Sequence, residues 1–316
     1  MIGVFVAILA NLSFVASNAM FRRVENEVSP IFINMFRTAV GLITFAILSL
    51  MLGIFTSIFL LPWSLWLILI ISFVFGQVIG DTFYFKSQKE LGTTKALAVS
   101  MIFPFFTFIL DLLFLKRPFD VLLIPSALFI SIGIIIISKY KIKLNVIDRE
   151  NSTEFKNYNS KSDNINKNSE IAPTIFAVIA SLGWAIGLVM IDYATNEINR
   201  ILLNENLSSV VGNLIRFPFA LFLLLIMVKK ENFDNNLQKK NTWFWLISAS
   251  IIGTSIGVYF FTEAARIAGA SVMSLIASAN PLFALPISYL LNREKLSIKG
   301  FFGVVLTFVG VILILI

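Results

Sequence analysis

GTSIGVYFFTEAARIAGASVMSLIASANPLFALPISYLL, which runs from Gly253 to Leu291, decides the fold because a diverged copy of it stands 177 positions earlier in the chain. The earlier copy, GQVIGDTFYFKSQKELGTTKALAVSMIFPFFTFILDLLF, runs from Gly76 to Phe114 without a gap. The shared glycines and prolines lie in register: Gly76, Gly80, Gly92 and Pro104 match Gly253, Gly257, Gly269 and Pro281. Because these residue types constrain the backbone, the match predicts a duplicated chain path. Each copy is expected to form a long helix, a tight turn and a second helix.

The composition predicts a membrane protein. Of the 316 residues, 58% are hydrophobic and 14% are charged, whereas about a quarter of a soluble domain is charged. The chain has no Cys and no His, which excludes disulfides, thiol nucleophiles, imidazole bases and most zinc or haem sites. We therefore expect no cofactor, no bound metal and no catalytic residue.

Apolar segments long enough to cross about 30 Å of hydrocarbon recur along the chain. Ten are predicted, at residues 2–20, 31–52, 63–85, 94–115, 121–138, 173–191, 208–228, 243–264, 271–291 and 298–316. Since five helices per copy is an odd number, the second copy must insert upside down relative to the first. The predicted fold is an all-α membrane protein with ten transmembrane helices in two inverted five-helix repeats, residues 1–138 and 173–316.

The basic residues predict the orientation in the membrane. Nineteen Lys and Arg lie in or beside the loops that follow helices 1, 3, 5, 7 and 9, and only four lie in the opposite loops. By the positive-inside rule the first set of loops is cytoplasmic, so that both termini are outside in the cell membrane. The net charge of +7 is thus a topology signal, and no nucleic-acid partner is expected. Lys116 and Arg117 are the discordant pair.

The linker between the repeats, residues 139–172, is rich in Asn, Ser and Lys and poor in aromatic residues. Such a segment buries too little apolar surface to fold alone. We expect a flexible cytoplasmic tether; a regulatory or partner-binding role stays open.

The duplication extends to other helices. Asn34-Met35-Phe36-Arg37 matches Asn213-Leu214-Ile215-Arg216, and Ser13-Phe14 matches Gly183-Trp184. With the runs Ala96 to Pro104 and Ser271 to Pro281 and the ending Leu291 to Glu294, the chain resembles a ten-helix member of the drug/metabolite transporter superfamily with two EamA-type domains. The resemblance covers the chain outside the tether, and it implies export of metabolites, amino acids or toxic compounds. The first half departs from the pattern at Lys116-Arg117-Pro118, where an acidic residue would follow the Arg.

Polar residues and prolines inside the apolar helices predict a central cavity. Pro104 and Pro281 each lie about ten residues into a helix, about 15 Å deep, and so near the bilayer midplane. Prolines there free backbone carbonyls, and interrupted helices at the midplane are typical of secondary transporters. A kink that only improves helix packing is the alternative. The candidate cavity residues are Asn11, Phe14, Gln77, Asp81, Tyr84, Ser100, Pro104, Trp184, Thr254, Tyr259, Ala277, Asn280 and Pro281.

Charged side chains inside the predicted spans form a second set of candidates. Arg37 and Arg216 lie seven or eight residues inside their helices, and a buried charge needs a partner. Their depths make pairs of Arg37 with Asp81 and of Arg216 with Asp111 feasible. These four residues are candidates for structural or gating roles, and either arginine could instead contact an anionic substrate.

The leading hypothesis is a secondary transporter with alternating access around a site between helices 3, 4, 8 and 9, and the resemblance implies that it is an exporter. The alternative is an intramembrane enzyme acting on a lipid-borne substrate, although Asp, Ser and Lys show no motif spacing here. A receptor would need a folded extramembrane module. The expected partners are a small-molecule substrate and the lipid bilayer. A proton on Asp81 or Asp111 is one coupling candidate, and uncoupled diffusion is the other.

Overall fold

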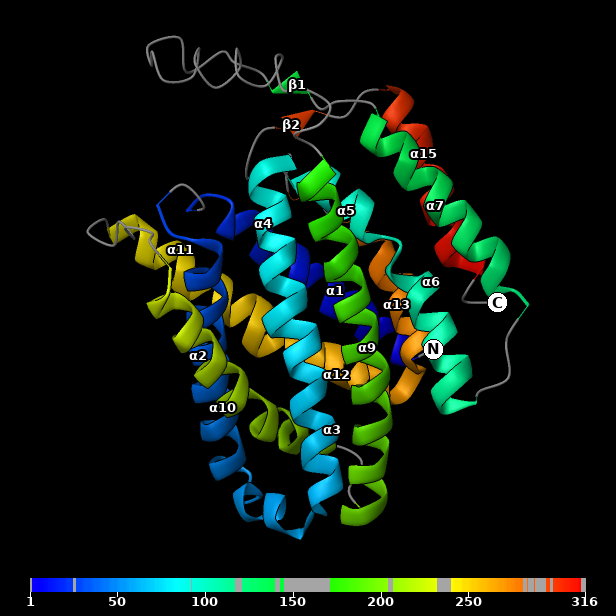
Figure 1. The fold of residues 1–316 in the computed structure, drawn as a ribbon. Coiled ribbons are helices and arrows are strands. Elements are labelled where there is room, and N and C mark those ends of the chain that lie inside the picture. The colour runs from blue at the N-terminus through cyan, green and yellow to red at the C-terminus, as the bar shows by residue number, and fades with distance from the viewer. Residues whose placement is uncertain are drawn as a thin grey trace.

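The structure is a computed structural model, and it describes residues 2–24, 27–91, 93–116, 121–139, 143–144, 171–203, 207–231, 240–280, 283, 287, 294–295 and 298–313. Within these ranges the chain is helical apart from one pair of two-residue strands (Figure 1). Those strands, β1 (Lys143–Leu144) and β2 (Glu294–Lys295), are antiparallel. Most of the predicted tether, residues 140–142 and 145–170, lies outside the described residues.

The described residues of the first half form five helical units. They are α1 (Ile2–Phe21), α2 (Pro30–Met51), a continuous helix made of α3 (Trp63–Phe73), η2 (Val74–Asp81) and α4 (Thr82–Leu91), then α5 (Thr93–Ser100) with α6 (Phe103–Leu110) and η3 (Asp111–Leu115), and α7 (Leu123–Lys139). A short 3-10 turn, η1 (Phe55–Leu60), joins α2 to α3. The η2 and η3 segments are π-helical.

The second half repeats much of this order. Its elements are α9 (Ile171–Leu202), α10 (Ser208–Lys229), a continuous helix of α11 (Lys240–Ser250), η6 (Ile251–Ile256) and α12 (Gly257–Ala268), then α13 (Ala270–Ser278) and α15 (Ile298–Leu313). The π-helical η6 starts 177 positions after η2, the offset of the sequence repeat. The duplication therefore preserves even the irregular part of the helix.

Six helices among the described residues are long and apolar enough to span a membrane: Ile2–Phe21, Pro30–Met51, Trp63–Leu91, Ile171–Leu202, Ser208–Lys229 and Asn241–Ala268. The helices at 103–115, 124–133 and 301–310 are apolar but shorter. The predicted span 94–115 is broken at Met101 and Ile102, directly before Pro104 at the start of α6. Ten spans and the inversion of the two repeats therefore stay predictions.

Helix α9 continues well beyond the predicted end of its span at residue 191. Asp192, the first residue after the predicted end, is fully buried. Its Oδ2 accepts a hydrogen bond of 2.6 Å from the backbone N–H of Ala270, the first residue of α13. Gly269, with φ of 85°, makes the tight turn between α12 and α13 that the sequence predicted.

Small residues bring helices of the two halves into close contact. A Cβ added to Gly183 would lie 2.6 Å from the carbonyl oxygen of Phe75, and one added to Gly187 would lie 2.7 Å from that of Ser72. The contact of α1 with the η6–α12 helix corresponds to this one, with Ser13 and Ser17 of α1 against Gly257 and Gly253. Close approach at small residues four apart is a common way to pack membrane helices.

Helices α7 and α15 pack along each other and lie to one side of the other helices (Figure 1). Gly310 permits this contact, because a Cβ there would lie 2.7 Å from Cγ1 of Ile130. An apolar pocket of about 600 Å³ separates α7 from α6, and Pro104 is among its lining residues.

Candidate functional site

A cavity of about 110 Å³ lies between helices of the two halves. Residues of both halves line it, from α1, α2, α3, η2, α6, α9, α10, η6, α12 and α13. Nine of the residues predicted from the sequence are among the lining: Asn11, Phe14, Arg37, Gln77, Asp81, Trp184, Arg216, Ala277 and Asn280. The structure thus brings together the polar side chains of helices that are distant in sequence.

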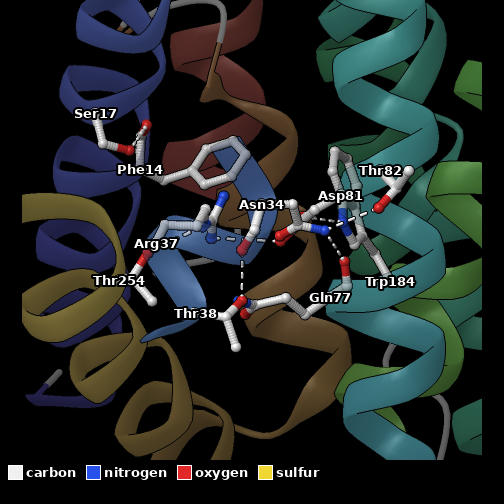
Figure 2. A network of polar contacts seen from close by, with 10 residues as sticks. All are labelled: Phe14, Ser17, Asn34, Arg37, Thr38, Gln77, Asp81, Thr82, Trp184 and Thr254. Atoms are coloured by element: carbon white, nitrogen blue, oxygen red, sulfur yellow. Dashed lines mark hydrogen bonds and ion pairs between the residues drawn. The ribbon is translucent and has the colours of Figure 1, made fainter. Parts of the chain in front are cut away.

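Arg37 and Asp81 form a buried ion pair, as the sequence predicted. Nη2 of Arg37 lies 3.3 Å from Oδ2 of Asp81, and the two side chains are only 4% and 8% exposed. Nε of Arg37 donates a 2.9 Å hydrogen bond to Oγ1 of Thr254, and Nε1 of Trp184 donates a 2.8 Å bond to Oδ1 of Asp81 (Figure 2). Because Thr254 and Trp184 belong to the second half, this pair connects the two halves at the cavity wall.

A second layer of hydrogen bonds fixes the π-helical segment η2 against α2 (Figure 2). The side-chain amide of Asn34 donates to the carbonyl oxygen of Gln77 at 2.8 Å and to Oγ1 of Thr82 at 2.9 Å. Nε2 of Gln77 donates to Oγ1 of Thr38 at 2.6 Å. These neutral groups are all buried. Oδ1 of Asn34 has no hydrogen-bond partner among the described residues, but the three donated bonds hold these side chains in one arrangement. This network positions Asp81 for Arg37.

Arg216 reaches the same cavity from α10 with different partners. Its Nη1 donates a 3.0 Å hydrogen bond to Oδ1 of Asn213, one turn earlier in the helix. The guanidinium carbon lies 4.3 Å from the centre of the Phe73 ring, a cation–π contact. Its Nε atom is buried and has no hydrogen-bond partner among the described residues.

The proposed pairing of Arg216 with Asp111 is absent from the described part of the chain. Asp111, at the start of η3, accepts a hydrogen bond from Oγ of Ser271 in α13. Equal depth in the membrane does not ensure contact, because it leaves open which way each helix face points. Phe73, which contacts the Arg216 guanidinium, was not predicted from the sequence.

Aromatic rings form one wall of the cavity. The Phe14 and Trp184 rings meet edge to face, with centroids 6.1 Å apart. Tyr84 lies in contact with Trp184, at 5.2 Å between centroids, but is not among the lining residues. Gly80 leaves room for the indole, because a Cβ there would lie 2.6 Å from Cδ1 of Trp184. The wall gives the cavity an apolar surface beside its charged groups.

The remaining candidates lie elsewhere. Ser100 donates to the carbonyl oxygens of Ala96 and Ala177, Thr254 contacts the site through Arg37, and Tyr259 packs beside Phe260. Pro104 lines the separate apolar pocket beside α7, and Pro281 lies outside the described residues.

Gly187 of α9 was likewise not predicted from the sequence as a site residue. Gly187 lines the cavity and allows α9 to approach η2. The signal was present in the chain, since Gly183 and Gly187 stand four apart, as Gly76 and Gly80 do.

Comparisons with known proteins agree with the fold. An uncharacterized transporter of Archaeoglobus fulgidus is 20% identical over 315 residues, which cover 100% of this chain and 98% of the relative. A solved structure described only as the crystal structure of a protein superposes with a TM-score of 0.69 at 15% identity and covers 99% of this chain and 94% of that one. The similarity to this solved structure concerns the fold alone.

The model of the EamA-like transporter family matches residues 1–139 and 172–316. Together with the apolar helices, the match makes the chain a multi-pass membrane protein. The family and the Archaeoglobus relative point to a transporter and not to an enzyme. The chain belongs to the EamA-like transporter family.

Proposed function

We propose that the protein is a secondary transporter that exports small organic molecules, such as metabolites, amino acids or drugs, by alternating access around the central cavity. The observation that carries the proposal is the cavity itself, which is lined by both halves and by the buried side chains of Arg37, Asp81 and Arg216. Ionisable side chains in the membrane interior are costly, and they typically mark a substrate or ion pathway.

The corresponding helix contacts support a two-part movement. Gly183 and Gly187 of α9 pack against the first half, and the matching Ser13 and Ser17 of α1 pack against the second half. The first helix of each half thus packs against the other half. Such an exchange fits inverted repeats that rock against each other around a shared site.

The Arg37–Asp81 pair would serve as a gate in this movement. Its bonds to Thr254 and Trp184 tie α2 and η2 to the second half, so the cavity cannot open along this seam while they persist. The cavity volume of about 110 Å³ is below the 300 to 1,000 Å³ usual for ligand pockets. Entry of a substrate of ordinary size would therefore require the helices to separate.

Transport is tested by reconstitution into liposomes with an imposed pH gradient. A panel of amino acids, organic acids and organic cations is screened against protein-free liposomes. Asn280→Leu is the matched variant, because Asn280 lines the cavity with a buried Oδ1 that has no partner among the described residues. Leucine keeps a similar volume but removes both the donor and the acceptor.

We expect Asn280→Leu to reduce flux at least several-fold while membrane insertion and thermal stability stay close to wild type. Unchanged uptake kinetics for every accepted substrate would move the binding site away from this cavity. A dependence of flux on the pH gradient would identify proton coupling, with Asp81 as the first candidate carrier of the proton. Flux that is the same with and without the gradient would indicate uncoupled diffusion.

Orientation is tested separately. The proposed topology has both termini outside and residues 139–172 in the cytoplasm. The absence of native Cys makes single-cysteine labelling clean. A cysteine introduced as Ser160→Cys should resist an impermeant maleimide in intact cells and react after permeabilisation. Labelling in intact cells would reverse the assignment.

A further inference from the structure

The ionisable groups of the cavity do not balance. Among the described lining residues they are Arg37, Asp81 and Arg216, two guanidinium groups and one carboxylate. Arginine stays protonated even when buried, and Arg37 already holds the carboxylate. The cavity therefore carries about one excess positive charge, and it belongs to Arg216.

Among the described residues, no ion pair joins Arg216 to an acid. Glu263 accepts from Arg266 and Ser209, Asp192 accepts from Ala270 and Asn196, and Asp111 accepts from Ser271. The sequence that follows α13, residues 281–293, contains neither Asp nor Glu. Because an uncompensated buried charge is strongly unfavourable, Arg216 needs a partner from outside the chain.

The donor geometry describes that partner. Nη1 of Arg216 is used by Asn213, whereas Nε is buried and unsatisfied. Arg37 likewise has a buried Nη1 without a partner among the described residues. Both arginines line one cavity, and each has a buried N–H donor without a hydrogen-bond partner among the described residues. Phe14, Trp184 and Phe261 supply apolar lining beside them. This combination suits an anion attached to an apolar body.

We propose that Arg216 is a carboxylate-binding subsite, and that the transported molecule is a small organic acid or zwitterion whose carboxylate replaces the acid that the second half lacks. The inference rests on the proposed transport function and narrows its substrate class. Charge-assisted hydrogen bonds to guanidinium are short and strong. A carboxylate should therefore bind with much higher affinity than a neutral amide of the same shape.

The test uses four matched four-carbon probes: butyrate, butyramide, butylammonium and 2-aminobutyrate. The purified protein is heated in detergent at constant ionic strength, because a ligand that binds only the folded state raises the melting temperature with its concentration. We expect butyrate and 2-aminobutyrate to stabilise the wild type, and butyramide and butylammonium to have little effect. Stabilisation by butyramide equal to that by butyrate, or an equal effect of sodium chloride, would overturn the proposal.

Variants assign the effect to Arg216. Arg216→Gln should weaken butyrate binding at least about tenfold, and Arg216→Lys should retain part of it. Arg200→Gln is the control. The Arg200 side chain is 77% exposed and does not line the cavity, so the substitution removes the same charge outside the site. If Arg216→Gln binds butyrate as the wild type does, the subsite lies elsewhere.

A second variant covers the case in which Arg216→Gln fails to fold. Val258 lines the cavity and stands 177 positions after Asp81, so Val258→Asp would restore the missing acid inside the chain. It should abolish butyrate binding without lowering the melting temperature of the ligand-free protein. Undiminished butyrate binding in a folded Val258→Asp protein would count against the proposal.

Parallel flux measurements separate the two proposals. Binding of butyrate without flux of any probe would contradict the transport function and leave the carboxylate subsite in place. Equal flux of butyrate and butyramide, unaltered by Arg216→Gln, would retain the transporter and remove the subsite. Flux of 2-aminobutyrate but not of butyrate would support the subsite and identify the substrate as a zwitterion.

Discussion

The two buried arginines occupy matching places in the two halves but have different surroundings. Each follows an asparagine by three residues, in Asn34 to Arg37 and Asn213 to Arg216. Arg37 meets Asp81, whereas the residue that corresponds to Asp81 in the second half is Val258. The comparison shows that duplication preserved the backbone path while one half kept a closed ion pair and the other kept an uncompensated charge.

The largest effect is expected from breaking the closed pair. Asp81→Ala leaves Arg37 buried without its acid, and such a loss typically costs about 3 to 5 kcal/mol. The double variant Arg37→Ala/Asp81→Ala should lose less stability than the sum of the two single variants. Thermal unfolding of the purified proteins measures this cycle. Additive losses would mean that the pair contributes no coupling energy.

A smaller difference is expected between the two helix contacts. An alanine Cβ at Gly187 would lie 2.7 Å from a backbone carbonyl oxygen, whereas at Gly257 it would lie 3.1 Å from the Ser13 side chain. Gly187→Ala should therefore destabilise by about 1 to 3 kcal/mol through overpacking, and Gly257→Ala by less.

Gly212→Ala is the control for this comparison, because its nearest neighbours would be 3.5 Å away or farther. It should be neutral, or slightly stabilising through helix propensity. Melting temperatures in detergent rank the three variants. Equal losses of melting temperature in Gly187→Ala and Gly257→Ala would show that the two helix contacts accommodate an added methyl group equally well.

The smallest difference is expected between two substitutions that each remove a single hydroxyl group. Thr254→Val removes an acceptor from the charged Nε of Arg37, a bond worth about 1.5 to 3 kcal/mol. Thr262→Val removes the neutral partner of Asn213, worth about 0.5 to 1.5 kcal/mol. Both changes keep the side-chain shape, so the difference in unfolding free energy reports the charge. A larger loss in Thr262→Val would contradict this ranking.

The sequence was sufficient for those features that backbone chemistry or charge dictates. Gly269 predicted the turn before α13, Pro104 predicted the break before α6, and the need of Arg37 for an acid predicted its pair with Asp81. In each case a single residue type allows few local solutions. The repeat then extended these predictions from one half to the other.

Features that depend on helix rotation were not predictable. The bond from Trp184 to Asp81 and the contact of Arg216 with Phe73 depend on which faces of distant helices meet. Side-chain depth, which the sequence supplies, leaves that rotation undetermined, and the expectation of an Asp111 partner for Arg216 was wrong for this reason. The π-helical segments have no signature in composition or hydropathy.

Those π-helical segments affect how mutations along each helix will be tolerated. A π turn uses i to i+5 hydrogen bonds and so winds in an extra residue, while each residue of an α-helix advances the direction of its side chain by about 100°. The residues that face the protein interior therefore follow a helical pattern before η2 or η6, and after the π-helical segment the pattern continues with a shift in phase. A saturation scan along Trp63–Leu91 would produce two periodic patterns of tolerance, out of step with each other across residues 74–81.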